Sequence, residues 1–326
     1  MSLPRRAPGP ARRRTGRLLA AGLLLLTLAG CATVQTDQLR AAPPPGLPAR
    51  IELTSVPYHA QEAHQCGPAS LAMAMGAVGR EVTPQQLEPQ VYLPGREGSL
   101  QIEMLAATRR HDLVAYELAP SLADLLSEVA AGNAPIVLQN LAFSWYPVWH
   151  YAVVIGYDLD QRSVILRSGP QSRQVLSLGT FENTWKRSQY WAMVALPPQR
   201  LPATAQQGRY VEAAVALEKS GTPAAARAAY QTALARWPED LSARIGLGNT
   251  AYALGDLRAA EQAFRAATRS HPESAIAFNN LADTLARQKR YKEALAAARQ
   301  AVRLGGPQQA AFAQTLEQIQ SRLKPH

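Results

Sequence analysis

Cys66 stands directly before a helical pattern, and its surroundings suit nucleophilic chemistry. Pro68, two residues later, fits the first turn of a helix. The N-terminus of a helix carries free N–H groups and a positive partial charge, which stabilise the thiolate, the nucleophilic form of cysteine. Gly67 would let the backbone come close to a substrate carbonyl. The alternative for Cys66 taken alone is a packed structural thiol.

Nucleophilic catalysis also needs a base and a group that stabilises an oxyanion. His150 opens a strongly apolar stretch, and a strand end can present an imidazole to a cleft. Gln61 lies far enough upstream of Cys66 for its side-chain amide to reach an oxyanion beside the Cys66 N–H. Gln65 adjoins Cys66, so we expect its side chain to point elsewhere.

The elements that must position these residues change in type along residues 51–197. The early part has apolar residues at helical spacing, and the later part is rich in Val, Ile and Leu, which is typical of strands. Helices first and an antiparallel sheet after them make an α+β layout. We expect helices at 68–78, 83–87, 100–108, 121–131 and 180–187, and strands at 135–140, 150–158, 163–167, 174–177 and 190–196.

Two strings carry a family resemblance. Gln-Cys-Gly-Pro-Ala-Ser at 65–70 and His-Tyr-Ala-Val-Val-Ile-Gly-Tyr-Asp at 150–158 resemble the bacteriocin-processing (double-glycine leader) cysteine peptidase family and its stand-alone, papain-like relatives. The resemblance covers about residues 51–197 and implies an α+β papain-like cysteine peptidase domain. It further implies that Cys66 is the nucleophile, Gln61 the oxyanion donor and His150 the general base.

One departure from the family concerns the third catalytic member. The family usually places an aspartate followed by proline after the next strand, where it orients the imidazole. Here Ser168 is the nearest polar match, and a hydroxyl orients an imidazole more weakly than a carboxylate. Asp158 lies eight residues past His150, at the expected far end of the same strand. A catalytically inactive, peptide-binding scaffold is therefore the alternative to a cysteine peptidase. Acyl transfer to an amine would use the same residues as hydrolysis.

The last third of the chain repeats with a period of 34 residues. Tyr230, Phe264 and Ala298 share this spacing, as do Pro238 and Pro272. The pattern resembles the tetratricopeptide repeat, in which pairs of helices stack into an all-α solenoid. We expect three repeats over 207–308, a capping helix and tail over 309–326, and a boundary near 197–202. The resemblance implies a concave surface that binds a protein partner.

The N-terminus has the features of an export signal. Six arginines without an acid precede a short apolar run, and Leu28-Ala29-Gly30-Cys31 follows. This string resembles the lipobox of bacterial lipoproteins, which implies a signal over 1–31, an acylated Cys31 and a membrane anchor. Ala32 in place of aspartate leans toward the outer membrane, facing the periplasm. The proline-rich segment 32–50 is expected to be an extended tether.

Several other classes of function have little support. The six N-terminal arginines account for most of the net charge of +10 and leave +4, without a basic stripe that would predict nucleic-acid binding. His59 and His64 near Cys66 lack the spacing of a zinc site, and 95–99 lacks phosphate-loop spacing, so no metal or cofactor is expected. Three tryptophans near the predicted site are expected in the core or in the cleft wall: Trp145, Trp149 and Trp191.

Overall fold

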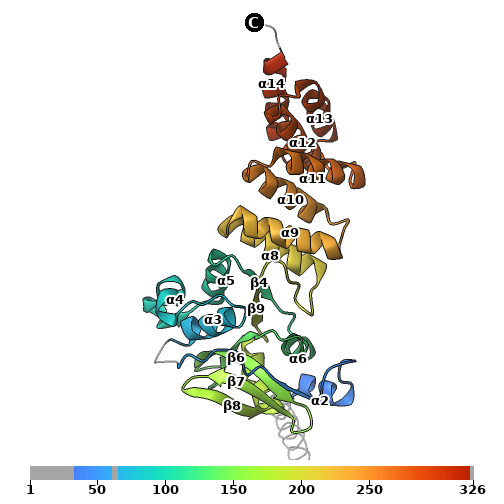
Figure 1. The fold of residues 1–326 in the computed structure, drawn as a ribbon. Helices are drawn as coiled ribbons and strands as arrows, with labels where there is room; N and C mark the ends of the chain where they lie inside the picture. The colour runs from blue at the N-terminus through green and yellow to red at the C-terminus, as the bar shows by residue number, and fades with distance from the viewer. Residues whose placement is uncertain (1–32, 61–64, 324–326) are drawn as a thin grey trace, which may run out of the picture.

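The computed structural model describes residues 33–60 and 65–323 of the 326-residue chain. Cys31, Gln61 and the expected signal over 1–31 lie outside the described residues. Figure 1 shows an α+β part at one end and a stack of helices rising from it. None of the helices in the described ranges combines the length and apolar character of a membrane span.

The α+β part is built on one sheet, which has seven strands in the described residues. The order is β4-β9-β5-β6-β7-β8, with β1 paired to the far part of β6, and every pairing is antiparallel. The strands are β1 (Arg50–Glu52), β4 (Val114–Glu117), β5 (Ile136–Asn140), β6 (Trp149–Asp158), β7 (Ser163–Ser168), β8 (Gln171–Ser177) and β9 (Ala192–Leu196).

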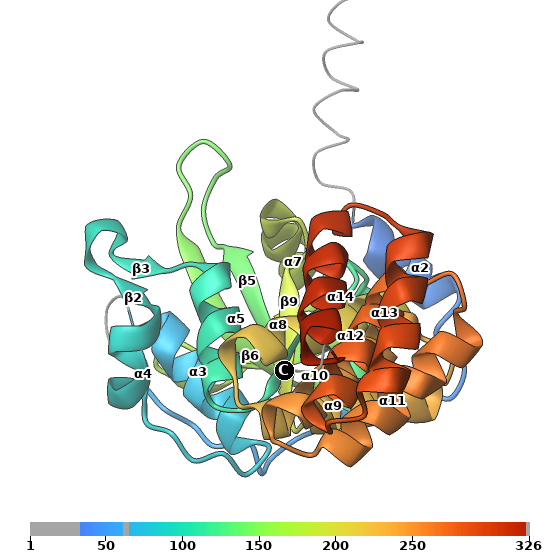
Figure 2. The ribbon, with the colours of Figure 1, turned by 90° about the horizontal axis from the view of Figure 1, so that it is seen from above.

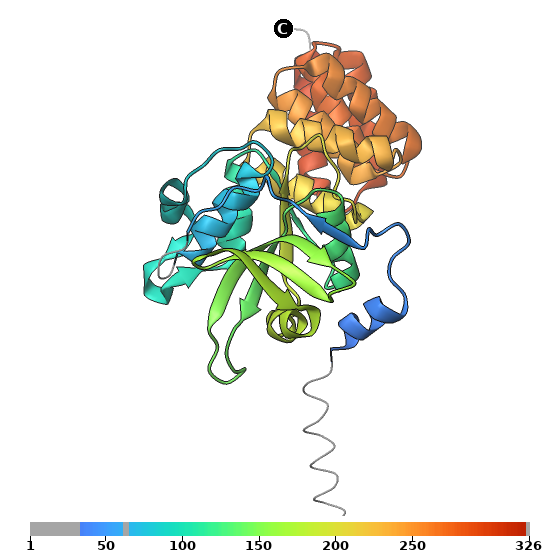
Figure 3. The same cartoon turned by 60° about the horizontal axis from the view of Figure 1, so that its bottom comes forward.

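The central strand β6 is buried on both faces because helices cover the two sides of the sheet. Tyr151 and Val153 pack toward α3 (Cys66–Gly76), α4 (Pro84–Val91) and α5 (Gln101–Arg110). Ala152 and Val154 pack on the other side, where α6 (Leu122–Ala130) and α7 (Leu178–Trp185) lie (Figure 3). Burial on both faces explains why β6 is an almost unbroken apolar run rather than an alternating one.

Short-range sequence patterns predicted most of these helices and strands at the correct positions. The expected helix at 121–131 is α6, and the Ser121 side chain accepts a hydrogen bond from the Asp124 N–H at its start. The α+β prediction is confirmed. One α-helix and four strands were missed: α2 (Val34–Ala41), β1, β4 and the small hairpin of β2 (Tyr92–Leu93) and β3 (Gly98–Ser99). The missed strands are two to four residues long, too short for a periodic signal.

The prediction of an extended tether over 32–50 is wrong for its first part, which is the helix α2. Leu39 of α2 is buried in the core shared by α6 and α7. Glu182 of α7 accepts hydrogen bonds from the N–H groups of Gln35 and Thr36, at 3.0 and 2.7 Å. A buried carboxylate at the first turn of α2 stabilises the helix end, which the composition of the segment does not reveal.

The C-terminal part consists of three helix pairs and a last helix. The pairs are α8 (Gln207–Ser220) with α9 (Pro223–Arg236), α10 (Leu241–Ala253) with α11 (Leu257–Ser270), and α12 (Ala275–Arg287) with α13 (Tyr291–Leu304), followed by α14 (Gln309–Leu323).

Two glycines allow close packing between helices. A Cβ at Gly246 would overlap the Tyr230 ring, and a Cβ at Gly248 would overlap the Phe264 ring. The aromatic and glycine positions of the repeat are therefore complementary.

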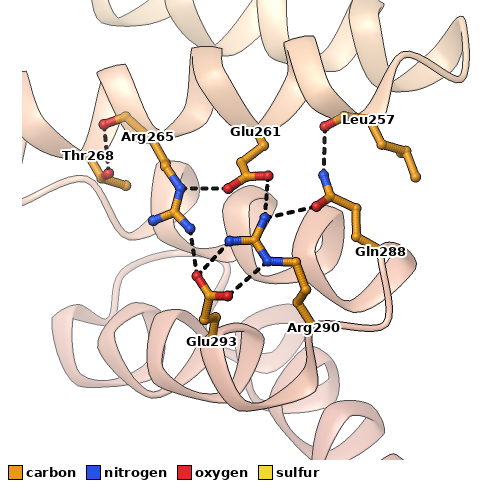
Figure 4. Close-up of polar contacts among 7 residues, drawn as sticks. All are labelled: Leu257, Glu261, Arg265, Thr268, Gln288, Arg290 and Glu293. Atoms are coloured by element: carbon orange, nitrogen blue, oxygen red, sulfur yellow. Dashed lines mark hydrogen bonds and ion pairs between the residues drawn. The ribbon is translucent and has the colours of Figure 1, made fainter.

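A network of charged side chains joins the second and third pairs (Figure 4). Glu261 accepts hydrogen bonds from Arg265 and Arg290, at 2.7 and 2.6 Å, and Glu293 bonds to the same two arginines. The hydrogen bonds from Arg290, and then from Arg265, hold the pKa of Glu293 below its ordinary value. Because the network is partly solvent-exposed, salt should weaken its contribution to stacking.

The first repeat packs directly onto the α+β part. Tyr210 and Tyr230 belong to the same core as Val114 and Tyr116 of β4. The connecting segment is held by Glu128 of α6, a fully buried carboxylate. Glu128 accepts hydrogen bonds from the Thr204 N–H at 2.8 Å and from the Thr204 hydroxyl at 2.6 Å. The two parts therefore form a continuous core and not two bodies on a loose linker.

Replacing Glu128 with alanine is expected to destabilise this junction by about 3 kcal/mol, because the Asn133 amide and the Thr204 donors lose their buried acceptor. The measurements are the thermal unfolding midpoint and the rate of proteolysis within 197–206. Glu212→Ala, which removes an exposed carboxylate from the neighbouring α8, is the control and should change stability by less than about 0.5 kcal/mol. Equal effects of the two substitutions would contradict the role of Glu128.

Candidate active site

Cys66 is the first residue of α3, as the position of Pro68 predicts. The N-cap residue is Gln65, and the first turn of the helix carries no acidic residue. A Cβ at Gly67 would overlap the side chain of Ser99, which comes from β3. Gly67 therefore serves close packing of the β2–β3 hairpin against the helix start. The expected approach of the Gly67 backbone to a substrate carbonyl stays a prediction.

His150 is the second residue of β6 and pairs with Gln139 of β5. Its Nε2 atom lies 2.9 Å from the hydroxyl oxygen of Ser168, the last residue of β7. Ser168 is buried, so water competes little for this hydrogen bond. In the tautomer in which Nε2–H donates to Ser168, the lone pair lies on Nδ1 and is available to accept a proton.

Cys66 and His150 line the same cleft, which has a volume of about 1270 Å³. Its walls come from the β2–β3 hairpin, the turn between β5 and β6, and the segment before β9. Both basic and acidic side chains reach it, and these are Arg96, Glu97, Glu117, Arg187 and Arg209. No hydrogen bond joins the Cys66 sulfur to the His150 ring, although both residues are described. Catalytic contacts in unliganded enzymes are often longer than in the substrate complex.

Burial sets the protonation of both groups. It raises the pKa of the Cys66 thiol above its ordinary value, and the backbone N–H groups of Tyr151, Gly67 and Cys66 act in the opposite direction but do not outweigh it. Burial also lowers the pKa of His150. Near neutral pH the cleft therefore holds a neutral thiol and a neutral imidazole. The helix N-terminus alone does not produce the stable thiolate that the sequence suggested.

Alkylation of Cys66 by iodoacetamide is expected to have its midpoint above that of an ordinary cysteine, about 8.5. The sign follows from the raised thiol pKa, because the reactive thiolate forms only at higher pH. Mass spectrometry of the tryptic peptide 51–80 isolates Cys66 from Cys31. Urea-unfolded chain is the control and should return the ordinary midpoint. A rate that is already maximal near pH 7 would show that the helix end outweighs burial.

The other polar residues considered for the site are Gln61, Gln65 and Asp158. Gln61 is outside the described residues, so its oxyanion role stays a prediction. The Gln65 side chain donates to Glu88 of α4 at 3.3 Å. Asp158 is eight residues along β6 from His150, about 26 Å away at the rise of a strand, and so cannot orient the imidazole. It lines a second cavity of about 720 Å³, whose lining includes neither Cys66 nor His150.

Ser99 is a cleft residue that the sequence does not single out, whereas Trp191 and Trp145 were expected in the core or in the cleft wall. Ser99 lines it beside Cys66, and its buried hydroxyl has no hydrogen-bond partner among the described residues. Trp191 also lines it, as expected, and its indole N–H donates to Glu117 at 2.7 Å. Trp145 lies neither in the core nor in the cleft wall and is 81% exposed, which contradicts the prediction for this residue. Within the described ranges, no group of three or more His, Cys, Asp or Glu side chains is arranged to hold a metal.

Family models match both parts of the chain. Residues 53–193 match the Peptidase_C39 like family, and residues 211–257 and 245–310 match the tetratricopeptide repeat. A C39-like peptidase from Bacillus anthracis is 19% identical over 45% of this chain and 97% of its own, with a TM-score of 0.39. The type III secretion translocator chaperone SycD of Yersinia enterocolitica, in an alternative dimer, is 18% identical over 36% of this chain and 95% of its own, with a TM-score of 0.35. No curated protein matches the chain.

Proposed function

Because the chain joins a Peptidase C39-like domain to tetratricopeptide repeats, we propose that it is a cysteine peptidase whose repeats bind protein. The observation that carries the proposal is the cleft shared by Cys66, at the start of α3, and His150, at the start of β6. These residues are far apart in sequence, and only the packing of α3 against the sheet places them in one cavity. The volume of about 1270 Å³ is ample for a peptide segment.

The reaction starts from the neutral pair. His150 takes the thiol proton on Nδ1 as the Cys66 sulfur attacks the peptide carbonyl carbon, and the carbonyl oxygen becomes an oxyanion. The Cys66 N–H and the Gln61 amide stabilise that oxyanion. The C–N bond breaks, and the imidazolium returns its proton to the leaving amine. Water, deprotonated by His150, then hydrolyses the thioester and regenerates the thiol. Ser168 holds the ring by accepting from Nε2–H.

A peptide-binding scaffold without turnover is the second candidate. Two observations favour it: burial raises the pKa of Cys66, and a hydroxyl at Ser168 stands where the related peptidases have a carboxylate. In that case the cleft would retain peptides, and the repeats would be the main functional surface. Acyl transfer is a variant of the first candidate, in which an amine replaces water.

The two candidates are separated by incubating the chain with a peptide mixture and measuring both new peptide termini and retained peptides. A peptidase generates new C-termini, and it forms a thioester on Cys66 that hydroxylamine cleaves. Cys66→Ala should retain peptides without generating termini. Retention by the unmodified chain with no new termini would instead establish the scaffold. Products joined to an added amine would identify acyl transfer.

We further propose that Cys31 carries a lipid anchor and that the protein resides in the bacterial envelope, on the periplasmic face of the outer membrane. The Leu28-Ala29-Gly30-Cys31 string and the preceding basic and apolar regions support this. Metabolic labelling with an alkynyl fatty acid should mark the chain, and Cys31→Ser should remove the label. A label that persists in the variant would place acylation elsewhere.

A further inference from the structure

An ordered hairpin with an apolar tip projects from the sheet between β5 and β6. The tip, residues 141–149, contains no charged residue. Its exposed fractions are large for such side chains: 62% for Phe143, 81% for Trp145 and 68% for Tyr146. Phe143 and Trp145 stack, with ring centroids 5.5 Å apart. A contiguous exposed patch of this kind marks an interaction surface.

Specific hydrogen bonds hold the tip in this position. Asn140, which is buried, accepts from the N–H groups of Ala142 and Val148 at 3.1 and 3.0 Å and donates to the Phe143 carbonyl at 3.2 Å. The Arg187 side chain donates to the carbonyls of Asn140 and Ala142 at 3.1 and 2.6 Å. The aromatic side chains are thus presented by a built support, and their exposure does not come from a loose loop.

The cleft accounts for only part of this surface. Tyr146, Val148 and Trp149 line the cleft that contains Cys66, so the inner side of the hairpin belongs to the proposed peptide site. Phe143 and Trp145, the stacked pair at the far end, are not among its lining residues. A substrate held between the walls of the cleft would therefore leave this pair exposed and available to another partner.

The direction in which the hairpin projects favours a lipid bilayer as the partner of this pair. Figures 2 and 3 show the tip projecting to the same side of the molecule as the N-terminal end of α2. The described chain begins at Thr33, two residues after Cys31, and two residues of chain span at most about 7 Å. A lipid on Cys31 would thus hold a bilayer against this side. Uncharged aromatic side chains beside an exposed cation, here Arg187, suit the headgroup layer of an anionic bilayer.

We propose that the hairpin tip docks on the lipid bilayer and that Phe143 and Trp145 insert into its headgroup layer. This docking rests on the lipid anchor proposed above, because two aromatic side chains alone give weak membrane binding. It places the mouth of the Cys66 cleft near the membrane surface. Substrate segments close to the bilayer would then be favoured over those far from it.

The test uses the full acylated chain in vesicles of phosphatidylethanolamine and phosphatidylglycerol whose acyl chains carry bromine, a contact quencher of tryptophan. The tryptophan fluorescence of the wild-type chain should be lower in brominated than in unbrominated vesicles. In Trp145→Phe, most of this quenching should disappear. Trp237→Phe, which removes a tryptophan of the repeats, is the matched control and should retain it. Phe143→Ser should reduce the quenching while Trp145 remains present.

Two other outcomes would contradict the docking of the hairpin tip on the bilayer. If the chain floats with the vesicles but brominated lipid does not quench Trp145, the tip contacts a peptide or a second copy of the chain and not the bilayer. If the chain does not float, the anchor and the docking fail together. Reaction of Cys66 with a peptide probe, measured in the same vesicles, reports on the peptidase proposal separately from both.

Discussion

The Cys66→Ala variant is expected to lose peptide hydrolysis by at least about 1000-fold, because the thioester intermediate can no longer form. Cys66 is only partly buried, so the loss of its sulfur should cost about 1 kcal/mol of stability or less. The measurement is the single-turnover rate of peptide cleavage, with the thermal unfolding midpoint recorded for both proteins. A variant that stays folded but inactive isolates the chemical role of the thiol.

The matched control for this experiment is Cys31→Ser, compared in detergent. It removes the other cysteine of the chain and should leave hydrolysis unchanged if Cys66 alone supplies the nucleophile. Cleavage that persists in Cys66→Ala at the wild-type rate would exclude Cys66 as the nucleophile and with it the proposed mechanism.

The His150→Gln variant is expected to lower the rate of hydrolysis by about 100- to 10,000-fold, because a neutral thiol needs a base to remove its proton. The raised pKa of Cys66 and the lowered pKa of His150 make this dependence strong, since no preformed thiolate can substitute for the base. The measurement is kcat/KM as a function of pH. The wild-type acid limb should lie below pH 6.5, the ordinary value for His, because only the neutral imidazole accepts a proton.

Ser168 provides the control for the role of His150. Ser168→Ala removes the hydrogen bond to Nε2 but leaves the base, so its loss of rate should be smaller than that of His150→Gln. Ser168→Asp places a carboxylate beside the imidazole, which favours its charged form and raises its pKa. The acid limb of kcat/KM should then move to higher pH. An unmoved limb in Ser168→Asp would mean that another group controls the profile.

Most of the helices and strands could be predicted because their signals are short-range patterns in the sequence. The helix start at Pro68, the N-cap at Ser121 and the apolar run of β6 each depend on residues within a few positions of one another. The repeat pattern is local in the same sense, since Tyr230 and Phe264 meet small residues from adjacent helices. The α2 helix was missed because its support comes from Glu182, which is 146 residues away from Thr36.

The protonation of Cys66 depends on tertiary contacts as well as on its position at a helix start. From sequence, the helix start at Cys66 favours a thiolate, and that effect is present in the backbone N–H groups around the sulfur. The structure adds burial of the sulfur, which acts in the opposite direction and is larger. Burial sums contributions from every neighbouring atom, and those atoms come from segments that no local pattern connects.

The amino-acid sequence by itself determined the class of the domains and the period of the repeats, and it singled out one thiol and one imidazole as candidates for chemistry. Each of these is encoded in residue type and in short-range spacing. Only the tertiary structure decided that Cys66 and His150 line one cleft, that Ser168 reaches the imidazole, that Glu128 joins the two parts, and that Trp145 points outward. Those outcomes depend on contacts between distant segments, whose relative placement follows from the packing of the whole core.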